Sequence, residues 1–235
     1  LFVSDQAVWR PPKAIRGGVP ICFPQFSDLG PLGQHGFARN SRWEVECREE
    51  SAATLALRPS AAQLEAWPHP FELLLTVSLP SPRELEMQLE LKNTGASPFD
   101  FTLALHTYFA VEAASEAKVE GLKAVRYLDS LDGRREKVEE EEAVTFNGEV
   151  DRIYVTTPDS LRVVDGAAGR AVSIKKEGLP DAVVWNPWVE KSKRMADFGD
   201  EEYQKMVCVE AGAIKPAVVL APGAVWTARQ VLTAE

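Results

Sequence analysis

A period of two dominates the hydrophobic pattern of this chain. Four apolar residues at alternate positions, Leu85, Met87, Leu89 and Leu91, are separated by polar ones, and a turn signal follows at Asn93–Gly95. Because successive side chains of a strand point to opposite faces, this pattern predicts a half-buried β-strand and not a helix.

Similar runs recur along the rest of the chain, separated by Pro, Gly and Asn/Asp turns. Strands are predicted over Trp43–Arg48, Ala53–Leu57, Phe71–Leu79, Glu84–Lys92, Phe99–Phe109, Ala143–Phe146, Arg152–Thr156, Leu161–Val164, Ala171–Lys175, Met206–Glu210, Ala217–Leu220 and Ala224–Thr233. Helical patterns are scarce, and short helices are predicted only at Ser60–Trp67 and Lys191–Asp197. Many short strands with turn signals are typical of a sandwich or barrel. We therefore predict an all-β fold, a large antiparallel β-sandwich.

The composition fits one large domain over residues 1–235. The chain has 235 residues, 45% of them hydrophobic, and β-sandwiches of this length commonly fold as one domain. The net charge of −9 argues against nucleic acid as a partner, because its phosphates would be repelled. No apolar stretch approaches the roughly 20 residues of a membrane helix, so no membrane partner is expected.

The three cysteines, Cys22, Cys47 and Cys208, cannot all pair and lack metal-ligand spacing, which favours a reducing, cytoplasmic location. The chain opens at Leu1 with a sequence typical of a strand interior and without a methionine. We expect a preceding segment to be missing, so organellar targeting stays open as an alternative. The oligomeric state is not fixed by the sequence, and a monomer is favoured.

His106 stands at a position that suits a ligand. The apolar residues of its run, from Phe99 to Leu105, share one parity, whereas His106 shares the other with Thr102 and Tyr108. The histidine is therefore predicted on the more polar face of the strand. The alternative is a surface or structural histidine.

Glu210 shares its face of a predicted strand with Met206 and Cys208. A carboxylate beside such side chains is expected to be partly desolvated, which raises its pKa and makes it a better base near neutral pH. The alternative is a strand-end glutamate that points into water.

A loop rich in glycine and proline carries further polar residues. It runs through Gly33-Gln34-His35-Gly36-Phe37-Ala38-Arg39 and follows Ile15–Pro20, which contains Arg16. Tight turns in such a loop can gather side chains around a small, oxygen-rich, anionic ligand. A guanidinium can hold phosphate through two parallel hydrogen bonds, so Arg16 and Arg39 are candidate anion ligands, with Gln34 between them. His35 is a second-rank candidate, either for the ligand or for orienting a neighbour.

Other chemistries lack their motifs. No histidine pair has the spacing of a zinc site, and neither a Gly-x-Ser-x-Gly nor a phosphate-loop motif occurs. His69 lies between prolines and is interpreted as a structural or surface residue. The acidic run Glu136–Glu142 is interpreted as a solvated loop or hairpin edge. We predict no catalytic metal.

Several of these stretches resemble the glucose-6-phosphate 1-epimerases, a branch of the aldose 1-epimerase (mutarotase) family. Besides the glycine loop, the matching motifs are Leu105–Phe109, Gly178–Trp188, Met195–Phe198 and Val209–Gly212, and the similarity covers nearly the whole chain. The resemblance implies the large β-supersandwich of the galactose mutarotase type. Family members carry further N-terminal strands that this chain lacks. If these strands are absent from the protein, a sheet edge would be exposed, and if they have been cleaved, activity could survive.

The resemblance also implies an activity, the interconversion of the α and β anomers of a hexose 6-phosphate, foremost glucose 6-phosphate. Its acid–base chemistry needs no cofactor. The matching positions imply that His106 is the catalytic acid and Glu210 the catalytic base. They also imply contacts to a small-molecule phosphosugar from four residues, Arg16, Gln34, Arg39 and Asp151. Asp151 has a short local motif, and its alternative is a turn residue at the start of a strand.

Two other functions compete with this interpretation. A non-catalytic carbohydrate-binding or sugar-sensing sandwich could use the aromatic residues Tyr108, Trp185 and Trp188 as platforms. A glycoside hydrolase or lyase is disfavoured, because hydrolases normally use two carboxylates rather than one carboxylate and one histidine.

Overall fold

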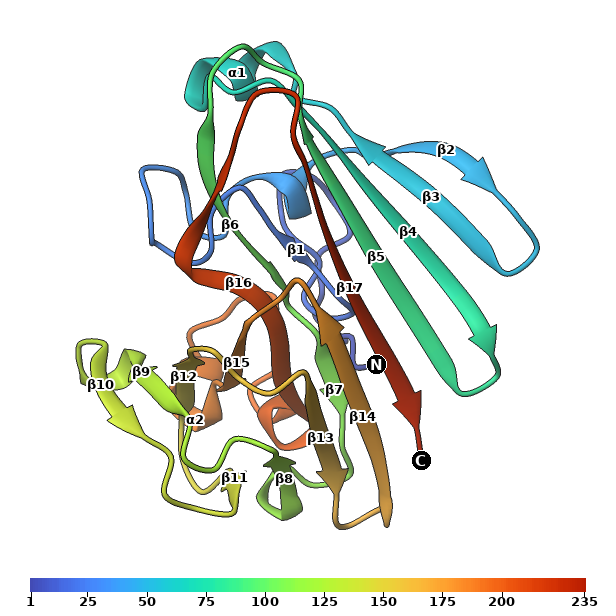
Figure 1. Cartoon of the computed structure of the whole chain (residues 1–235). Coiled ribbons are helices and arrows are strands. Elements are labelled where there is room, and N and C mark those ends of the chain that lie inside the picture. Colours follow the sequence, from blue (N-terminus) through green and yellow to red (C-terminus); the bar gives the residue numbers. More distant parts are fainter.

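Seventeen strands form two antiparallel sheets in the computed structural model, which describes residues 1–235 (Figure 1). The first sheet has eight strands in the order β1-β6-β16-β15-β12-β9-β10, with β7 paired to β16. The second has nine, in the order β11-β8-β13-β14-β17-β5-β4-β3-β2. The predicted all-β antiparallel sandwich is confirmed.

The bounds of the strands follow the order of each sheet. The first sheet consists of β1 (Ile21–Cys22), β6 (Phe99–Leu105), β16 (Met206–Leu220), β7 (Tyr108–Ala110), β15 (Asp181–Asn186), β12 (Val150–Tyr154), β9 (Arg126–Asp129) and β10 (Arg135–Val138). The second sheet consists of β11 (Ala143–Thr145), β8 (Ala117–Glu120), β13 (Ser160–Asp165), β14 (Arg170–Glu177), β17 (Val225–Ala234), β5 (Glu84–Asn93), β4 (Phe71–Ser81), β3 (Ala52–Leu57) and β2 (Glu44–Arg48).

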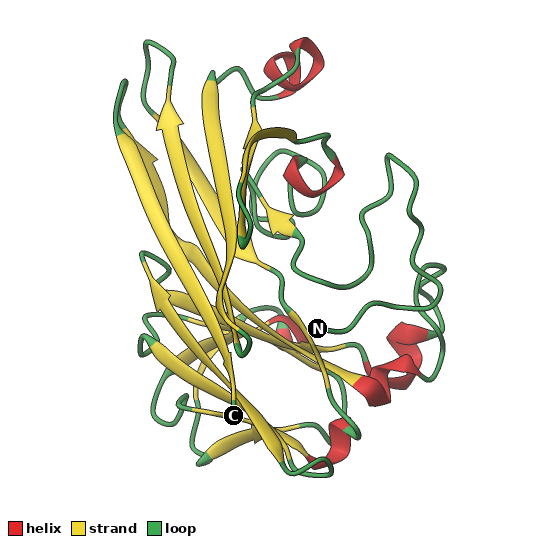
Figure 2. Ribbon diagram, turned by 90° about the vertical axis from the view of Figure 1, so that its right-hand side faces the viewer, coloured by secondary structure: helices red, strands yellow, loops and turns green.

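Helical structure is short and lies to one side of the strands (Figure 2). Helix α1 (Ala61–Ala66) confirms the first predicted helix, and a capping box between Ser60 and Gln63 fixes its start. Helix α2 (Trp188–Ser192) begins and ends earlier than the predicted 191–197. The 3₁₀ turns are η1 (Ala38–Asn40), η2 (Ala114–Glu116), η3 (Ser130–Asp132) and η4 (Glu202–Lys205). None of these segments combines the length and the apolar character that a membrane-crossing helix requires.

The core between the sheets is built from the strand faces that the period of two predicts. Phe101 and Leu103 of β6 share a buried cluster with Leu89 and Leu91 of β5. A second buried cluster of equal size packs residues of the first sheet, such as Val209 of β16, against residues of the second sheet, such as Val163 of β13. The opposite face of the first sheet is therefore the one available to a ligand.

Three predicted elements differ from the structure. The run Phe99–Phe109 is interrupted after β6, and its last residues form β7, which pairs with β16. The two strands predicted at Met206–Glu210 and Ala217–Leu220 are one long strand, β16, whose pairing with β6 shifts register on the way. The chain start is not a strand interior, since Val3 forms only an isolated bridge with Gly17.

Several strands of the first sheet do not show the alternation of apolar and polar residues from which strands are predicted. Strand β15 is buried at every position, so it shows no polar face from which a period of two could be detected. The first residues of the acidic run, up to Val138, form a hairpin edge, because β10 pairs only with β9, and the other residues form the loop before β11. Glu139 is the exception. It is buried and accepts hydrogen bonds from Tyr154 Oη at 2.6 Å and Arg152 Nη1 at 2.9 Å.

Asp181 stabilises the irregular part of β16. Its side chain is fully buried and accepts backbone hydrogen bonds from the N–H groups of Thr156 at 3.0 Å, Ile214 at 2.8 Å and Lys215 at 2.7 Å. The last two donors lie where the register between β16 and β6 shifts. The buried carboxylate thus supplies acceptors that the strand ladder does not.

Replacing Asp181 with alanine should therefore destabilise the fold. Asp181→Ala would leave three backbone donors without their acceptor, and we expect the free energy of unfolding to fall by about 3 kcal/mol or more. Urea denaturation followed by circular dichroism measures this change. Asp200→Ala, at an exposed carboxylate, is the control and should stay within about 0.5 kcal/mol of the parent. Equal midpoints for the two variants would contradict the assigned role.

Candidate active site

One cavity gathers all the residues that the sequence predicts for the site. Its volume is about 440 Å³, within the range typical of small-molecule pockets. The predicted site residues that line it are Arg16, Gln34, Arg39, His106, Asp151 and Glu210. Their proximity is a property of the fold, whereas their chemical roles stay predictions.

The register of the first sheet sets the floor of this cavity. Glu210 on β16 is the Cα partner of Val183 on β15, and Asp151 on β12 is the partner of Trp185. All four line the cavity, whereas Val184, of opposite parity, belongs to the core between the sheets. The site therefore lies on the outer face of the first sheet, opposite the core.

The glycine loop covers this face. Gly36 has a φ of +65°, and a Cβ added there would lie 2.4 Å from the carbonyl oxygen of Phe23. Only glycine combines that backbone conformation with such a close approach. The turn η1 follows directly and places Arg39 on the cavity wall.

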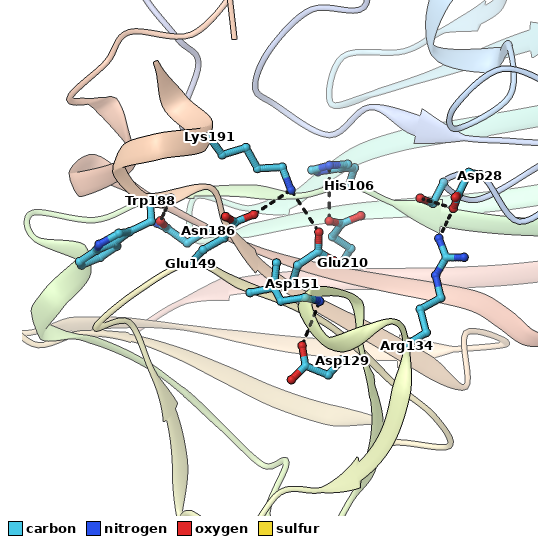
Figure 3. A network of polar contacts seen from close by, with 12 residues as sticks. Asp28, His106, Asp129, Arg134, Glu149, Asp151, Asn186, Trp188, Lys191 and Glu210 are labelled. Carbon is cyan, nitrogen blue, oxygen red and sulfur yellow. Dashed lines mark hydrogen bonds and ion pairs between the residues drawn. The ribbon is translucent and has the colours of Figure 1, made fainter. Parts of the chain in front are cut away.

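His106 and Glu210 form a buried pair at the cavity floor. The distance between His106 Nε2 and Glu210 Oε1 is 3.4 Å, and Figure 3 shows the two side chains pointing toward one another. The residues are only 6% and 2% exposed. The His106 ring stacks on Tyr108 with ring centroids 4.7 Å apart, and Trp185 meets it edge-on. Packing thus fixes the orientation of the imidazole.

Burial raises the pKa of the Glu210 carboxyl well above its ordinary value. The negative charge of Asp151 adds to this shift, and the positive charge of Arg39 opposes it. The direction agrees with the prediction from the apolar neighbours, since Met206 and Cys208 on the same strand are fully buried.

Burial lowers the pKa of His106 well below its ordinary value, and electrostatic interactions with His35, Arg39 and Arg16 lower it further. In the ligand-free cavity both members of the pair are therefore driven toward their neutral forms. An anionic ligand beside the arginines would offset part of this effect and favour the imidazolium.

His35 presents a neutral donor to the cavity. The backbone N–H of Ser27 donates to its Nδ1 at 3.2 Å, so the ring proton resides on Nε2. Burial lowers the pKa of His35 to about 3, with Arg39 and Arg16 contributing. Its ring also meets the ring of His106 edge-on, with centroids 5.5 Å apart. The second-rank candidate of the sequence is thus part of the site.

The two predicted arginines differ in their charge compensation. Arg16 Nη2 donates to both carboxylate oxygens of Asp197 at 3.1 Å, and its Nη1 donates to Tyr108 Oη at 3.2 Å. Arg39 has no carboxylate partner, and its Nη2 donates to the backbone oxygen of Gln34 at 3.0 Å. Arg39 is therefore the cation of the cavity whose charge no carboxylate of the protein neutralises.

The cavity contains two further cations that the sequence does not predict as site residues. Lys191, between the motifs at 178–188 and 195–198, contacts Asp151. Arg134, near the hairpin of β9 and β10, pairs with Asp28, which precedes the glycine loop (Figure 3). Only tertiary folding brings these pairs together, so spacing along the chain gives no signal for them.

Unpaired polar atoms concentrate at this cavity. Six buried side-chain nitrogens and oxygens lack a hydrogen-bond partner, and five of them belong to cavity residues. Those five are Arg16 Nε, Arg39 Nε, Arg134 Nε, His106 Nδ1 and Glu210 Oε2. Since protein interiors pair nearly all such atoms, the cavity fits a ligand that supplies both donors and acceptors. The structure contains no cluster of three or more His, Cys, Asp or Glu side chains suited to a metal ion.

Comparison with known proteins shows that nearly the whole chain matches one protein family. The sequence profile of the family described as "Aldose 1-epimerase" matches residues 2–233. A protein of Cenchrus ciliaris named "Putative glucose-6-phosphate 1-epimerase" is 43% identical over 245 residues, covering 100% of this chain and 74% of the relative. A protein of Escherichia coli K12 with the same name is 33% identical, covering 89% of this chain and 71% of that protein.

Solved structures share the architecture. The crystal structure of "a putative mutarotase" from Salmonella typhimurium superposes with a TM-score of 0.89 at 29% identity, covering 99% of this chain and 79% of that one. A "galactose mutarotase related enzyme" from Lactobacillus acidophilus gives a TM-score of 0.75 at 16% identity, covering 92% of this chain and 82% of that one. The galactose mutarotase type of fold, implied by the sequence motifs, is confirmed.

The histidines of the cavity should remain neutral in the ligand-free protein between pH 8 and pH 5. Their imidazole ¹⁵N shifts should not titrate over this range, whereas both rings should titrate near pH 6.5 in denaturant. Because the unfolded chain then binds protons that the folded chain does not, stability is lost as the pH falls below about 6.5. Each histidine contributes a slope of up to about 1.4 kcal/mol per pH unit.

His35→Gln should reduce this slope, measured as the free energy of unfolding at a series of pH values. A slope identical to that of the parent protein, or imidazole shifts of His35 that titrate near pH 6.5 in the folded state, would contradict the assignment.

Proposed function

This chain belongs to the aldose 1-epimerase family and is a sugar epimerase, and from that premise we propose that it interconverts the α and β anomers of hexose 6-phosphates, foremost glucose 6-phosphate. One observation carries the proposal. A buried histidine–glutamate pair lies in the same cavity as Arg39, an arginine that no carboxylate neutralises. The pair suits acid–base opening of a sugar ring, and the arginine suits a phosphate group.

In the proposed reaction Glu210 is the base and His106 the acid. Ionised Glu210 takes the proton of the C1 hydroxyl while the His106 imidazolium gives a proton to the ring oxygen. The bond between C1 and the ring oxygen breaks, and C1 becomes the aldehyde carbon. After rotation about the C1–C2 bond, the ring closes on the other face of the carbonyl with the two roles exchanged, so atoms and protons balance.

The short separation of the pair supports these roles. The hydroxyl oxygen and the ring oxygen are bonded to the same carbon, so an acid and a base that act on them must lie close together. A distance of 3.4 Å between His106 Nε2 and Glu210 Oε1 meets this requirement. The unpaired His106 Nδ1 and Glu210 Oε2 leave each side chain a second atom for the substrate or a water molecule.

Substrate charge would help to set the reactive protonation state. The arginines are among the causes that keep His106 neutral in the empty cavity. A phosphate dianion beside Arg39 and Arg16 would cancel part of that positive potential, which favours a proton on the His106 imidazole. The imidazolium, with Nε2 3.4 Å from Glu210 Oε1, would in turn favour loss of the proton from Glu210. The phosphate would thus contribute to catalysis as well as to binding.

The remaining cavity residues would bind the other oxygen atoms of the substrate. Arg39 is the main phosphate ligand in this proposal, and Arg16 contributes its unpaired Nε–H. Gln34 and Asp151 would bond phosphate or hydroxyl oxygens, and His35 Nε2–H would donate to the sugar. The net charge of −9 makes this local positive group necessary for an anionic substrate.

Removing either member of the pair should abolish anomer exchange. Glu210→Gln and His106→Asn should each lower kcat by about 10²- to 10⁴-fold, because each deletes a general acid–base group. Saturation-transfer NMR on glucose 6-phosphate measures the exchange rate directly. Glu90→Gln, at an exposed glutamate of β5, is the matched control and should leave the rate unchanged.

Near-normal exchange in either pair variant would overturn the assigned roles. An unaltered protein that binds the phosphosugar without accelerating exchange would favour the non-catalytic, sugar-sensing alternative.

Arg39 should decide the preference for phosphorylated sugars. Arg39→Ala should lower kcat/KM for glucose 6-phosphate by about 10- to 100-fold, the equivalent of one charge-assisted hydrogen-bonded contact, with little change for free glucose. Arg42→Ala, three residues farther along and exposed, provides the control. If the ratio of the two sugars stays unchanged in Arg39→Ala, Arg39 is not a phosphate ligand.

A further inference from the structure

Lys191 connects two carboxylates at the edge of the cavity. Its Nζ lies 3.0 Å from Glu149 Oε1 and 3.3 Å from Asp151 Oδ2 (Figure 3). The aliphatic part of the side chain extends from α2, and the ammonium lies 5.8 Å from the ring centroid of Trp185. All three charged side chains are only about a quarter to a third exposed, so their interaction is less screened than that of a surface pair.

Glu149 and Asp151 need a cation between them. Glu149 directly precedes β12 and Asp151 is its second residue, and both carboxylates lie against the Lys191 ammonium, where they would otherwise repel each other (Figure 3). Lys191 is the one positively charged group that contacts both. It therefore determines where the Asp151 carboxylate rests.

Asp151 in turn acts on Glu210. Strands β12, β15 and β16 are consecutive in the sheet, and both carboxylates line the cavity from its floor. The charge of Asp151 is the principal nearby charge that raises the pKa of Glu210. An uncompensated Asp151 would therefore oppose the ionisation that a base requires.

We propose that Lys191 is a positioning residue of the epimerase reaction. It holds the Asp151 carboxylate on the cavity wall and neutralises it, so that Asp151 can accept hydrogen bonds from the sugar while Glu210 remains able to ionise. This inference rests on the acid–base roles proposed above. It adds a residue that acts through Asp151 and not on the reacting atoms.

The other groups that face Glu210 do not depend on Lys191. They come from β1, the end of β6, β7, β16 and η1, and are Cys22, His106, Tyr108, Cys208 and Arg39. Burial raises the pKa values of both thiols and of the tyrosine, so these three stay neutral near pH 7. A change at Lys191 therefore reaches Glu210 through Asp151.

The test is the pH dependence of kcat/KM for anomer exchange, in which one limb reports the ionisation of the base in the free enzyme. Titration of the ¹³C-labelled Glu210 carboxyl identifies that limb. In Lys191→Met the negative charge of Asp151 is no longer neutralised, so this limb should move to higher pH by about half a unit or more. Asp151→Asn removes the charge and should move the limb to lower pH. Adding Lys191→Met to Asp151→Asn should then produce no further shift.

Three controls accompany this cycle. Lys191→Arg keeps the cation and should restore the limb to its position in the parent protein. Lys193→Met changes an exposed lysine at the end of the same helix and should have no effect. Lys191→Gln serves the same purpose as Lys191→Met if thermal unfolding shows that the methionine variant is not folded.

Several outcomes would overturn the proposal. A Glu210 limb that stays in place while the rate falls equally at every pH would indicate a merely structural lysine. An equal shift with and without Asp151→Asn would mean that Lys191 acts directly. A loss restricted to the phosphorylated sugar would make it a phosphate ligand. Failure of the underlying mechanism is separate, because it would appear as retained activity in Glu210→Gln.

Discussion

The contact between the His106 imidazole and the Glu210 carboxyl, 3.4 Å apart and almost completely buried, is the constraint on which the site depends. Desolvation penalises the charged form of each group, yet acid–base chemistry needs a proton to move between them and a ligand. Each also retains an atom without a hydrogen-bond partner, which costs stability in a folded protein. Such a pair persists only where the surrounding structure enforces it.

The two sheets provide this enforcement. The inner face of the first sheet contributes to a large apolar core, and that core fixes the register of β15 and β16. Register determines which side chains reach the outer face, because a slip of one residue would exchange Glu210 for Val209. Asp181 serves the same end, since it supplies acceptors where β16 departs from regular pairing. The chemistry of the outer face thus depends on hydrophobic packing on the inner one.

Alternation in the sequence predicts much of this arrangement and fails for physical reasons where it fails. The parity of Phe99–Leu105 placed His106 on the right face, and the neighbours of Glu210 predicted its raised pKa. Strand β15 carries Trp185 into the cavity but is buried on both faces, so it lacks a polar period. The pairing of Arg16 with Asp197 joins residues far apart in the chain, which no local pattern encodes. The family motifs supplied what alternation could not, because they span those distant segments together.

Charge balance explains why a strongly acidic chain can still suit an anionic ligand. The cavity contains four arginine and lysine side chains, and three of them contact carboxylates, namely Arg16, Arg134 and Lys191. Paired cations hold loops and carboxylates in place, but they add little net positive potential. Arg39 adds a charge that nothing in the protein cancels, and it lies close enough to influence both His106 and Glu210. A single guanidinium without a carboxylate partner can therefore link binding of a phosphate to the protonation state of the pair.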